Sequence, residues 1–253
     1  MNIIVCAKQV VDVSEMKVDP NTNKPILQGI PQKISDIDKN AMEEAIKIKD
    51  EFGGKIIVVT IGPADAKERI KELLAMGADE GVLVSLPKNH DYYVVSNLLA
   101  GAIKKIGEYD IILCGEASID MFSGQIGPRL AGLLGIPQIT YAQNITAEKD
   151  KVNAERNMGE KAVTTESTYP VLITVTKEIN EPRLPSLMQI LGAANKPINE
   201  WSDDSLAGGL NPKVEILELK GISMQRKNIV YKDDLDESIT KLVDSLAKEG
   251  VLR

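Results

Sequence analysis

The sequence is short of the residues on which many catalytic and metal sites depend. Its 253 residues include one histidine, His90, and two cysteines, Cys6 and Cys114. A single histidine gives little support to a histidine-based triad or a metal cluster. Both cysteines stand in apolar, strand-like segments, a position typical of buried thiols rather than of disulfides, zinc sites or protein-ligated iron–sulfur. We therefore expect no metal site and no catalytic side chain of these kinds.

Several partner classes are disfavoured in the same way. A net charge of -7 argues against nucleic acid, and with two phenylalanines and one tryptophan there is no aromatic platform for stacked bases. No apolar run approaches the roughly 20 residues that cross a bilayer. The chain starts directly in a strand pattern, without a basic leader. We expect a globular cytoplasmic protein with no nucleic-acid partner and no membrane span.

What is present is an alternation of strand and helix patterns. Strands are expected at 2–7, 55–61, 81–85, 110–114 and 137–141, and amphipathic helices at 36–52, 64–76 and 91–106. This order predicts a doubly wound, mostly parallel α/β sheet over about the first 140 residues, a Rossmann-like arrangement. In such sheets the ligand binds beyond the carboxyl ends of the strands, where the strand order reverses. Neither the glycine fingerprint of dinucleotide-binding dehydrogenases nor a P-loop occurs in the sequence.

After about residue 143 the pattern changes. Segments 144–148, 151–156, 162–167 and 171–176 are typical of strands, which we expect to form an antiparallel addition to the sheet. A polar linker at 202–212, a strand-like arm at 214–224 and an amphipathic helix at 232–248 follow. We divide the chain into a nucleotide-binding domain, 1–200, and a C-terminal section, 201–253, whose helix packs on a partner subunit. Packing on its own domain is the alternative.

The segment 111–129 contains a candidate anion-binding site. It begins as a buried strand, turns at Gly115 and passes through a loop with small polar residues into a helix expected from Gln125 to Leu134. We expect Ser123 to cap that helix. Free N–H groups and the positive end of a helix dipole then face one point, which favours an anion. An ordinary strand-to-helix connection is the other interpretation.

Several motifs, in order along the chain, resemble those of the β subunit of electron transfer flavoprotein. They are Val5-Cys-Ala-Lys-Gln-Val10 with Asp12, Glu43-Glu-Ala-Ile-Lys-Ile-Lys49, Gly62-Pro63, Leu74-Ala-Met-Gly-Ala-Asp79, Ile119-Asp120 through Gln125 and Gly127, Pro170, and Asn180-Glu-Pro-Arg183 with Ser186-Leu187 through Lys196-Pro197.

The resemblance implies an electron carrier subunit, rather than a stand-alone enzyme, paired with an α subunit that carries the redox flavin. The β subunit itself holds an adenine nucleotide: AMP in non-bifurcating members, or a whole FAD in electron-bifurcating members, where it accepts hydride from NADH. The motif Asp120-Met-Phe-Ser-Gly-Gln-Ile-Gly-Pro128 is more similar to that of the bifurcating members, although Phe122 replaces an acidic residue. FAD and NAD(H) are therefore expected, with AMP as the alternative.

The strand ends and the resemblance together imply a set of cofactor-binding residues. Cys6 and Ile61 would contact the adenine, Asp120 would accept from ribose hydroxyls or hold the loop, and the segment from Ser123 to Ile126 would give N–H groups to phosphate. The full expected set is Cys6, Ala7, Asp36, Ile61, Gly62, Cys114, Gly115, Asp120, Ser123, Gly124, Gln125, Ile126 and Gly127.

The family's recognition loop corresponds to 182–194. Leu187 stands at the position of the leucine that anchors an FAD-containing partner dehydrogenase, and Pro182, Arg183 and Met188 are expected beside it. A core position for Leu187 is the alternative. Ferredoxin is a candidate low-potential acceptor. A stand-alone adenine-nucleotide-binding stress protein is a further alternative, but it would need neither this loop nor the C-terminal arm.

Overall fold

The computed structural model describes residues 1–207, 209–221 and 227–252. These residues divide into two units. The larger unit comprises Met1–Lys17 and Ile26–Glu218, and the smaller one comprises Val18–Pro25 and the described residues from Leu219 onward.

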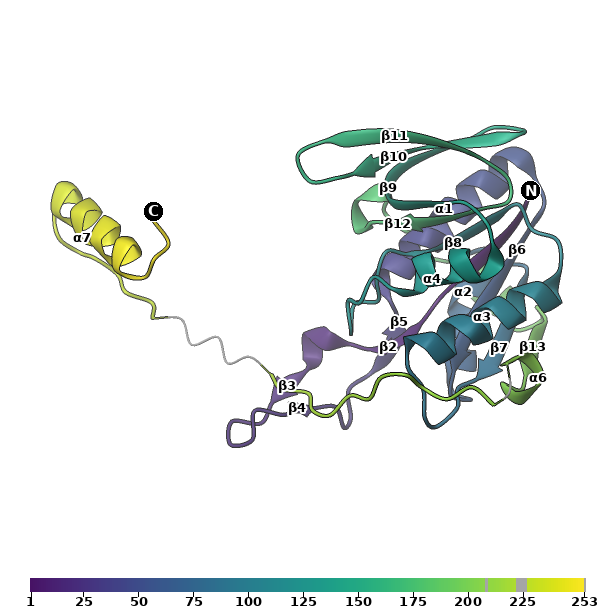
Figure 1. Ribbon diagram of the computed structural model, residues 1–253, viewed down its shortest axis with the longest axis horizontal. Coiled ribbons are helices and arrows are strands. Elements are labelled where there is room, and N and C mark those ends of the chain that lie inside the picture. Colours follow the sequence, from purple (N-terminus) through teal and green to yellow (C-terminus); the bar gives the residue numbers. More distant parts are fainter. Residues whose placement is uncertain (208, 222–226, 253) are drawn as a thin grey trace. The chain divides into compact units, whose positions relative to one another are not determined.

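A sheet of nine strands forms the centre of the larger unit, in the order β11-β10-β9-β12-β8-β1-β6-β7-β13 (Figure 1). The run from β9 to β13 in this order is parallel, and β10 and β11 are antiparallel to their neighbours. The strands are β1 (Asn2–Cys6), β6 (Lys55–Gly62), β7 (Glu80–Ser85), β8 (Ile111–Gly115), β9 (Gln138–Ala147), β10 (Lys151–Asn157), β11 (Ala162–Thr168), β12 (Val171–Val175) and β13 (Ile198–Trp201).

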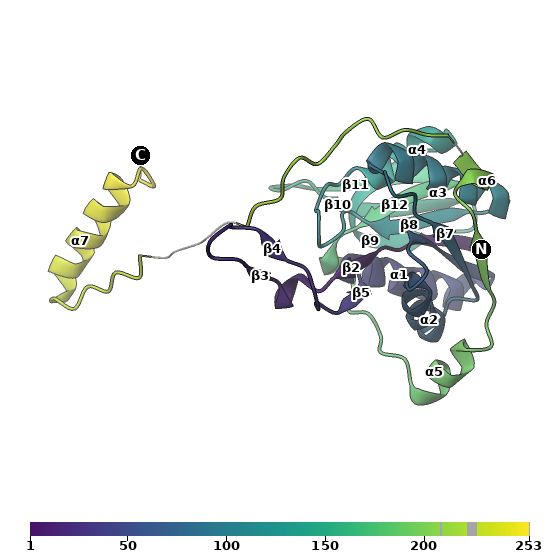
Figure 2. The ribbon, with the colours of Figure 1, turned by 90° about the horizontal axis from the view of Figure 1, so that it is seen from below.

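Helices cover both faces of this sheet, as expected of a doubly wound fold (Figure 2). α1, α2 and α5 contribute to one hydrophobic core, and α3 and α4 to the other. The helices are α1 (Asp36–Phe52), α2 (Ala66–Met76), α3 (Tyr92–Ile106), α4 (Ile126–Leu134), α5 (Leu187–Ala193) and α6 (Asp204–Ala207), with 3₁₀ helices η1 (Val13–Glu15) and η2 (Lys177–Ile179).

Local signals fix several of these boundaries. α1 ends at Phe52 because Gly53 takes a positive φ of 69° and its N–H bonds to the Lys49 carbonyl oxygen. α3 begins after Asp91, whose carboxylate accepts from the Val94 N–H at 2.9 Å. The predicted α/β fold is confirmed, and the helix expected at 36–52 has those bounds.

Three expectations about the later strands were wrong. Segments 137–141 and 144–148 are parts of one strand, β9, and β12 is not part of an antiparallel addition but parallel to both β8 and β9. Every residue of β12 is buried, and a strand buried on both faces suits the middle of a parallel sheet. In the arm at 214–224, residues 214–221 form no strand, and 222–224 lie outside the described residues.

Two small antiparallel pairs and a final helix complete the structure. β2 (Gln9–Val11) pairs with β5 (Gln32–Ile34), and β3 (Lys17–Val18) pairs with β4 (Pro25–Ile26). In the smaller unit, α7 (Leu235–Lys248) begins after Asp234, whose carboxylate accepts from two N–H groups of the first turn. None of the described helices has the length and apolar character that a membrane crossing requires.

Candidate functional site

The strand order reverses beside β1. From β1 the chain moves to β6 and β7 on one side, and then returns to place β8 on the other side. Cys6 lies directly opposite Cys114, at the carboxyl ends of β1 and β8. Of the other residues expected at this edge, Ala7 continues β1 by bonding to the Val59 carbonyl oxygen, and Gly115 ends β8. In a doubly wound sheet, this edge is where a ligand is expected to bind.

Ile61 and Gly62 lie at the end of β6, on the other side of β1. Gly62 is buried, and a side-chain carbon there would stand 3.0 Å from the β-carbon of Ala66, at the start of α2. A larger residue at position 62 would therefore meet the first turn of α2.

Asp38, which sequence reasoning did not select, joins the two central strand ends. Its carboxylate oxygens accept from the Lys8 N–H at 2.9 Å and from the Gly115 N–H at 3.0 Å. Gly115 is required here, because an added β-carbon would stand 2.8 Å from the Asp38 carboxylate. Burial raises the pKa of Asp38 to about 7, against the opposing effect of those two N–H donors.

The sequence signal for Asp38 was weak. It is one of two acidic residues, Asp36 and Asp38, in the first turn of α1, and either could favour a helix N-terminus. The structure separates their roles. Asp36 is only partly buried and pairs with Lys33 at 3.0 Å, whereas the buried Asp38 points into the strand ends.

Lys8 and Asp120 form an ion pair across this edge, with 2.7 Å between Nζ and Oδ2. Burial opposes ionisation of Asp120, but hydrogen bonds from Lys8 and Ser118 outweigh it, so the pKa of Asp120 lies below its usual range. The loop is also tied to the start of α1, where the Ser35 hydroxyl accepts from the Ile119 N–H at 3.4 Å. Through these contacts Asp120 joins the loop to Lys8, and its expected contact with ribose hydroxyls stays a prediction.

The end of this loop offers donors to an anion. Among the described residues, the N–H groups of Ser123, Gly124 and Gln125 have no hydrogen-bond acceptor. Gly124 has φ of 63°, a conformation that glycine adopts without strain. The first turn of α4 follows directly, and its N–H groups also lack partners within the helix. These donors fit a phosphate group.

The expectation that Ser123 caps α4 was wrong. Gln125 is the N-cap residue, and its side chain accepts from Arg129 at 3.1 Å instead of capping the helix. The physical reason is the position of the helix start: α4 begins at Ile126, three residues after Ser123, so a cap at Ser123 would stand too far upstream.

Gly127 sets the distance between α4 and the sheet. A β-carbon at this position would stand 2.4 Å from Cγ2 of Thr174 in β12. The helix N-terminus therefore lies directly against the strand, and the ends of β8 and β12 form the floor of the site.

The two thiols are buried, as the sequence predicted. Burial raises the pKa of Cys6 to about 12 and raises that of Cys114 well above its ordinary value. Neither is a thiolate at neutral pH, so neither is activated as a nucleophile. The described residues contain no group of three or more His, Cys, Asp or Glu side chains arranged to hold a metal ion.

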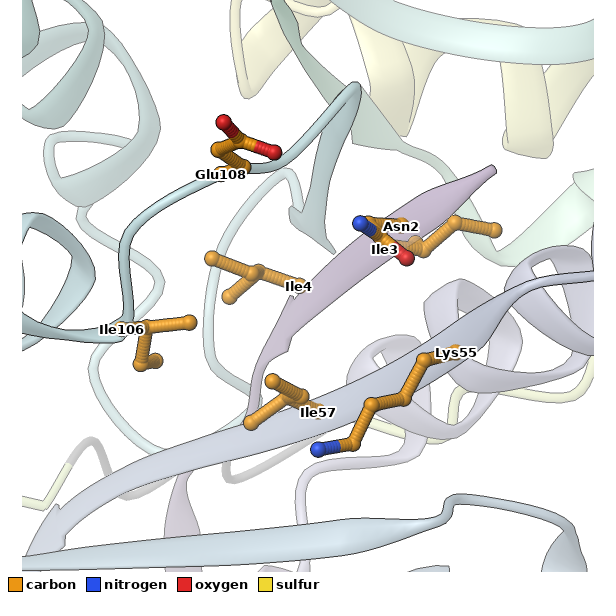
Figure 3. Close-up of a pocket in the computed structure, with 7 residues that line it drawn as sticks. All are labelled: Asn2, Ile3, Ile4, Lys55, Ile57, Ile106 and Glu108. Carbon is orange, nitrogen blue, oxygen red and sulfur yellow. The ribbon is translucent and has the colours of Figure 1, made fainter.

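A cavity of about 340 Å³ lies elsewhere (Figure 3). It opens at the amino-terminal ends of β1 and β6, opposite to the ends that carry the loop and Asp38. Its lining residues are Asn2, Ile3, Ile4, Lys55, Ile57, Ile106 and Glu108. It has none of the expected cofactor-binding residues, so we do not assign the nucleotide to it.

The segment 182–194 presents an apolar surface around α5. The exposed fraction is 92% for Leu184, 71% for Leu187 and 76% for Met188, so the core alternative for Leu187 finds no support here. Ser186 and Gln189 form a reciprocal capping box at the start of the helix.

Ionic and amide contacts hold the base of this segment to α1. The Arg183 guanidinium binds both oxygens of Glu43, at 2.9 Å from Nε to Oε2 and 2.9 Å from Nη2 to Oε1. Asn40 and Asn180 exchange hydrogen bonds between their side chains and backbones, at 2.7 and 3.0 Å. Arg183 thus holds the segment in position, and because its side chain is 40% exposed, its expected role beside Leu187 stays a prediction.

The chain is similar in sequence to known electron-transfer proteins. The family model described as "Electron transfer flavoprotein domain" matches residues 25–206. The chain is 42% identical over 270 residues to the electron transfer flavoprotein subunit beta of Megasphaera elsdenii, and 36% identical over 261 residues to that of Thermoanaerobacterium thermosaccharolyticum, with all of both chains covered in each case.

The chain belongs to the electron transfer flavoprotein β-subunit family. It is an electron-transfer subunit, and β subunits of this family partner with α subunits. A further relative is the caffeyl-CoA reductase-Etf complex subunit CarD of Acetobacterium woodii, 40% identical over 84% of this chain and 82% of that protein.

Proposed function

We propose that this electron transfer flavoprotein β subunit binds FAD at the ends of β1 and β8 and, with its α subunit, passes electrons from NADH by flavin-based bifurcation. The main support for this nucleotide site is the group of free N–H donors at Ser123, Gly124 and Gln125. They lie directly before α4, where the strand order reverses. A phosphate placed there meets both these donors and the positive end of the helix dipole.

The other expected residues would serve the nucleotide in distinct ways. The ends of β1 and β8, at Cys6, Ala7, Cys114 and Gly115, offer backbone and apolar surface to the adenine. Ile61 and Gly62 extend that surface on β6. The flavin would supply the redox chemistry, while this chain's residues position it and limit its exposure to water.

The preference for FAD over AMP rests on the motif Ser123-Gly-Gln-Ile-Gly-Pro128, whose sequence is more similar to that of the bifurcating members. A relative is named as a subunit of a caffeyl-CoA reductase-Etf complex, which supports an association of this chain with a partner redox enzyme, and we propose an FAD-containing dehydrogenase. For such a partner we propose the exposed segment 182–194, with Leu187 as its anchor. For the α subunit we propose the C-terminal section 201–253, because the apolar side chains of α7, among them Leu235 and Ile239, are exposed in this chain.

The test is nucleotide analysis of the full-length chain purified with its α subunit. After denaturation, two FAD per heterodimer are expected. One FAD and one AMP would instead establish the non-bifurcating alternative with a structural nucleotide. A stable homodimer that needs no α subunit would contradict both and favour a stand-alone nucleotide-binding protein. Stopped-flow reduction by NADH then tests the electron donor, because both flavins should be reduced in the bifurcating form.

A further inference from the structure

Tyr141 has an unusual backbone conformation next to the proposed nucleotide site. Its φ is 60°, in the left-handed region that costs a non-glycine residue about 1–3 kcal/mol unless its surroundings impose it. It lies in β9 at the point where the register with β12 shifts, between the pairs of Ile173 and Val175. This places it level with the carboxyl end of β12, on the edge that carries the loop before α4.

Two sets of contacts hold this conformation. The Tyr141 N–H donates to the Thr174 hydroxyl at 3.0 Å. Arg156, on β10, fixes the preceding residue: its Nε donates to the Thr140 carbonyl oxygen at 2.8 Å, and its Nη2 to the Thr140 hydroxyl at 2.7 Å. Thr174 is the same residue that stands against Gly127 in the first turn of α4. The backbone of Tyr141 is therefore positioned relative to the N-terminus of α4.

The side chain of Tyr141 extends to the donors of the loop. Its hydroxyl lies 3.9 Å from the point where a β-carbon on Gly124 would stand. Tyr141 is 44% exposed, and its hydroxyl has no hydrogen-bond partner among the residues that the structure describes. A free hydroxyl donor thus stands beside the free N–H groups of Ser123, Gly124 and Gln125.

We propose that Tyr141 is a ligand-binding residue of the nucleotide site, whose hydroxyl donates a hydrogen bond to a phosphate oxygen of the bound adenine nucleotide. This inference rests on the proposed function, since it needs a nucleotide whose phosphate lies at the N-terminus of α4. Charged acceptors form the stronger hydrogen bonds, and a donor held in place before binding loses little entropy on binding. The proposal gives the register shift in β9 a role, because the backbone conformation of Tyr141 there places its hydroxyl beside the loop.

The test compares two probes that differ by the phosphate. The full-length chain with its α subunit is freed of bound nucleotide and titrated with AMP and with adenosine in a calorimeter. Tyr141→Phe keeps the ring and removes only the hydroxyl, so AMP affinity should fall about tenfold, the loss expected for one hydrogen bond to a charged group. Adenosine affinity should not change. The affinity for FAD, measured by competition with AMP, should fall by a similar factor.

Two further variants separate binding from structure. Tyr141→Asn places at φ 60° a residue that tolerates this conformation, so the melting temperature should not fall although AMP binds more weakly. Tyr109→Phe removes a tyrosine hydroxyl that precedes β8, at the opposite end of the sheet, and should leave AMP affinity unchanged.

Three outcomes would overturn the proposal. AMP affinity unchanged in Tyr141→Phe would overturn this inference alone. Equal losses for AMP and adenosine would also overturn it, because the hydroxyl would then not act on the phosphate. A wild-type heterodimer that binds neither AMP nor FAD would overturn the proposed function, and this inference with it.

Discussion

At the scale of single residues, the site depends on polar groups that join separate strand ends. Asp38 connects the ends of β1 and β8, and the pair of Lys8 and Asp120 closes the loop over them. Each contact joins residues far apart in the chain: 77 positions separate Asp38 from Gly115, and 112 separate Lys8 from Asp120. These groups should therefore affect both stability and the shape of the nucleotide site.

Asp38 should make the stability of the chain depend on pH. Burial raises its pKa from 3.8 to about 7, so between these values the folded chain holds a proton that the unfolded chain has released. Its contribution to the free energy of unfolding is complete below about pH 4 and is lost as the pH rises to 7, a change on the order of a few kcal/mol. Urea unfolding of the full-length chain between pH 4.5 and 8 measures it.

The matched variants are Asp38→Asn and Asp65→Asn. Asp38→Asn removes one acceptor for the backbone, which lowers stability at every pH, but it should also remove most of the slope between pH 4.5 and 7. Asp65→Asn changes an exposed carboxylate and should keep the wild-type slope. Parallel curves for wild type and Asp38→Asn would show that Asp38 does not titrate in this range.

The ion pair of Lys8 and Asp120 should contribute modestly. Both groups are only partly buried, so their coupling should be about 1 kcal/mol. A double-mutant cycle with Lys8→Met and Asp120→Asn measures it by urea unfolding, and the double variant should lose less than the sum of the single losses. Additive losses would mean that the 2.7 Å contact does not stabilise the loop.

At the scale of elements, the close contact of α4 with β12 places the helix N-terminus over the strand ends. Gly127 permits this contact, and Gly124 permits the turn before it. Both glycines are needed for geometry, the first for space and the second for its positive φ. The same helix contains Gly132, which meets no such restriction.

Gly127→Ala and Gly132→Ala form a matched pair in α4. At Gly127 the new methyl group would stand 2.4 Å from Thr174, so we expect a loss of about 1–3 kcal/mol and a lower nucleotide content. At Gly132 no atom lies within 4 Å, and alanine should stabilise the helix by about 0.5–1 kcal/mol. Thermal unfolding with quantified nucleotide checks both. Equal effects of the two variants would contradict the close contact at Gly127.

On a larger scale, the described residues include an exposed apolar surface on 182–194 and another on α7. Contacts from Arg183 and Asn180 to α1 hold the first in a defined conformation. A positioned apolar surface of this kind suits a transient interface, in which a few side chains supply most of the binding free energy. The second surface belongs to the smaller unit, and we propose the α subunit as its partner.

Leu187→Ala should slow electron transfer to the partner dehydrogenase by about tenfold or more, because a central apolar anchor is commonly worth 2 kcal/mol or more. Nucleotide content should remain that of wild type, since α5 packs on the face of the sheet opposite to α4. Reduction kinetics of the heterodimer with the dehydrogenase provide the measurement. Leu133→Ala, an exposed leucine of α4, serves as the control. Unaltered transfer in Leu187→Ala would exclude it as the anchor.

Features controlled by short-range interactions could be predicted from the amino-acid sequence. Apolar periodicity predicted the bounds of α1, and the alternation of strands and helices predicted the doubly wound sheet. The loop before α4 was found from its glycines and its strand-to-helix order. These features depend on residues within a few positions of one another. Short sequence patterns are therefore enough to predict them.

The remaining features depend on contacts between distant parts of the chain. Only the folded chain placed β12 between β8 and β9, brought Asp38 to the Gly115 N–H, and set the Tyr141 hydroxyl beside Gly124. Strand order and register bring these residues together across long stretches of chain, and a local pattern encodes neither. The capping expectation at Ser123 was wrong for a related reason: where α4 begins depends on its packing against Thr174 as well as on its own sequence.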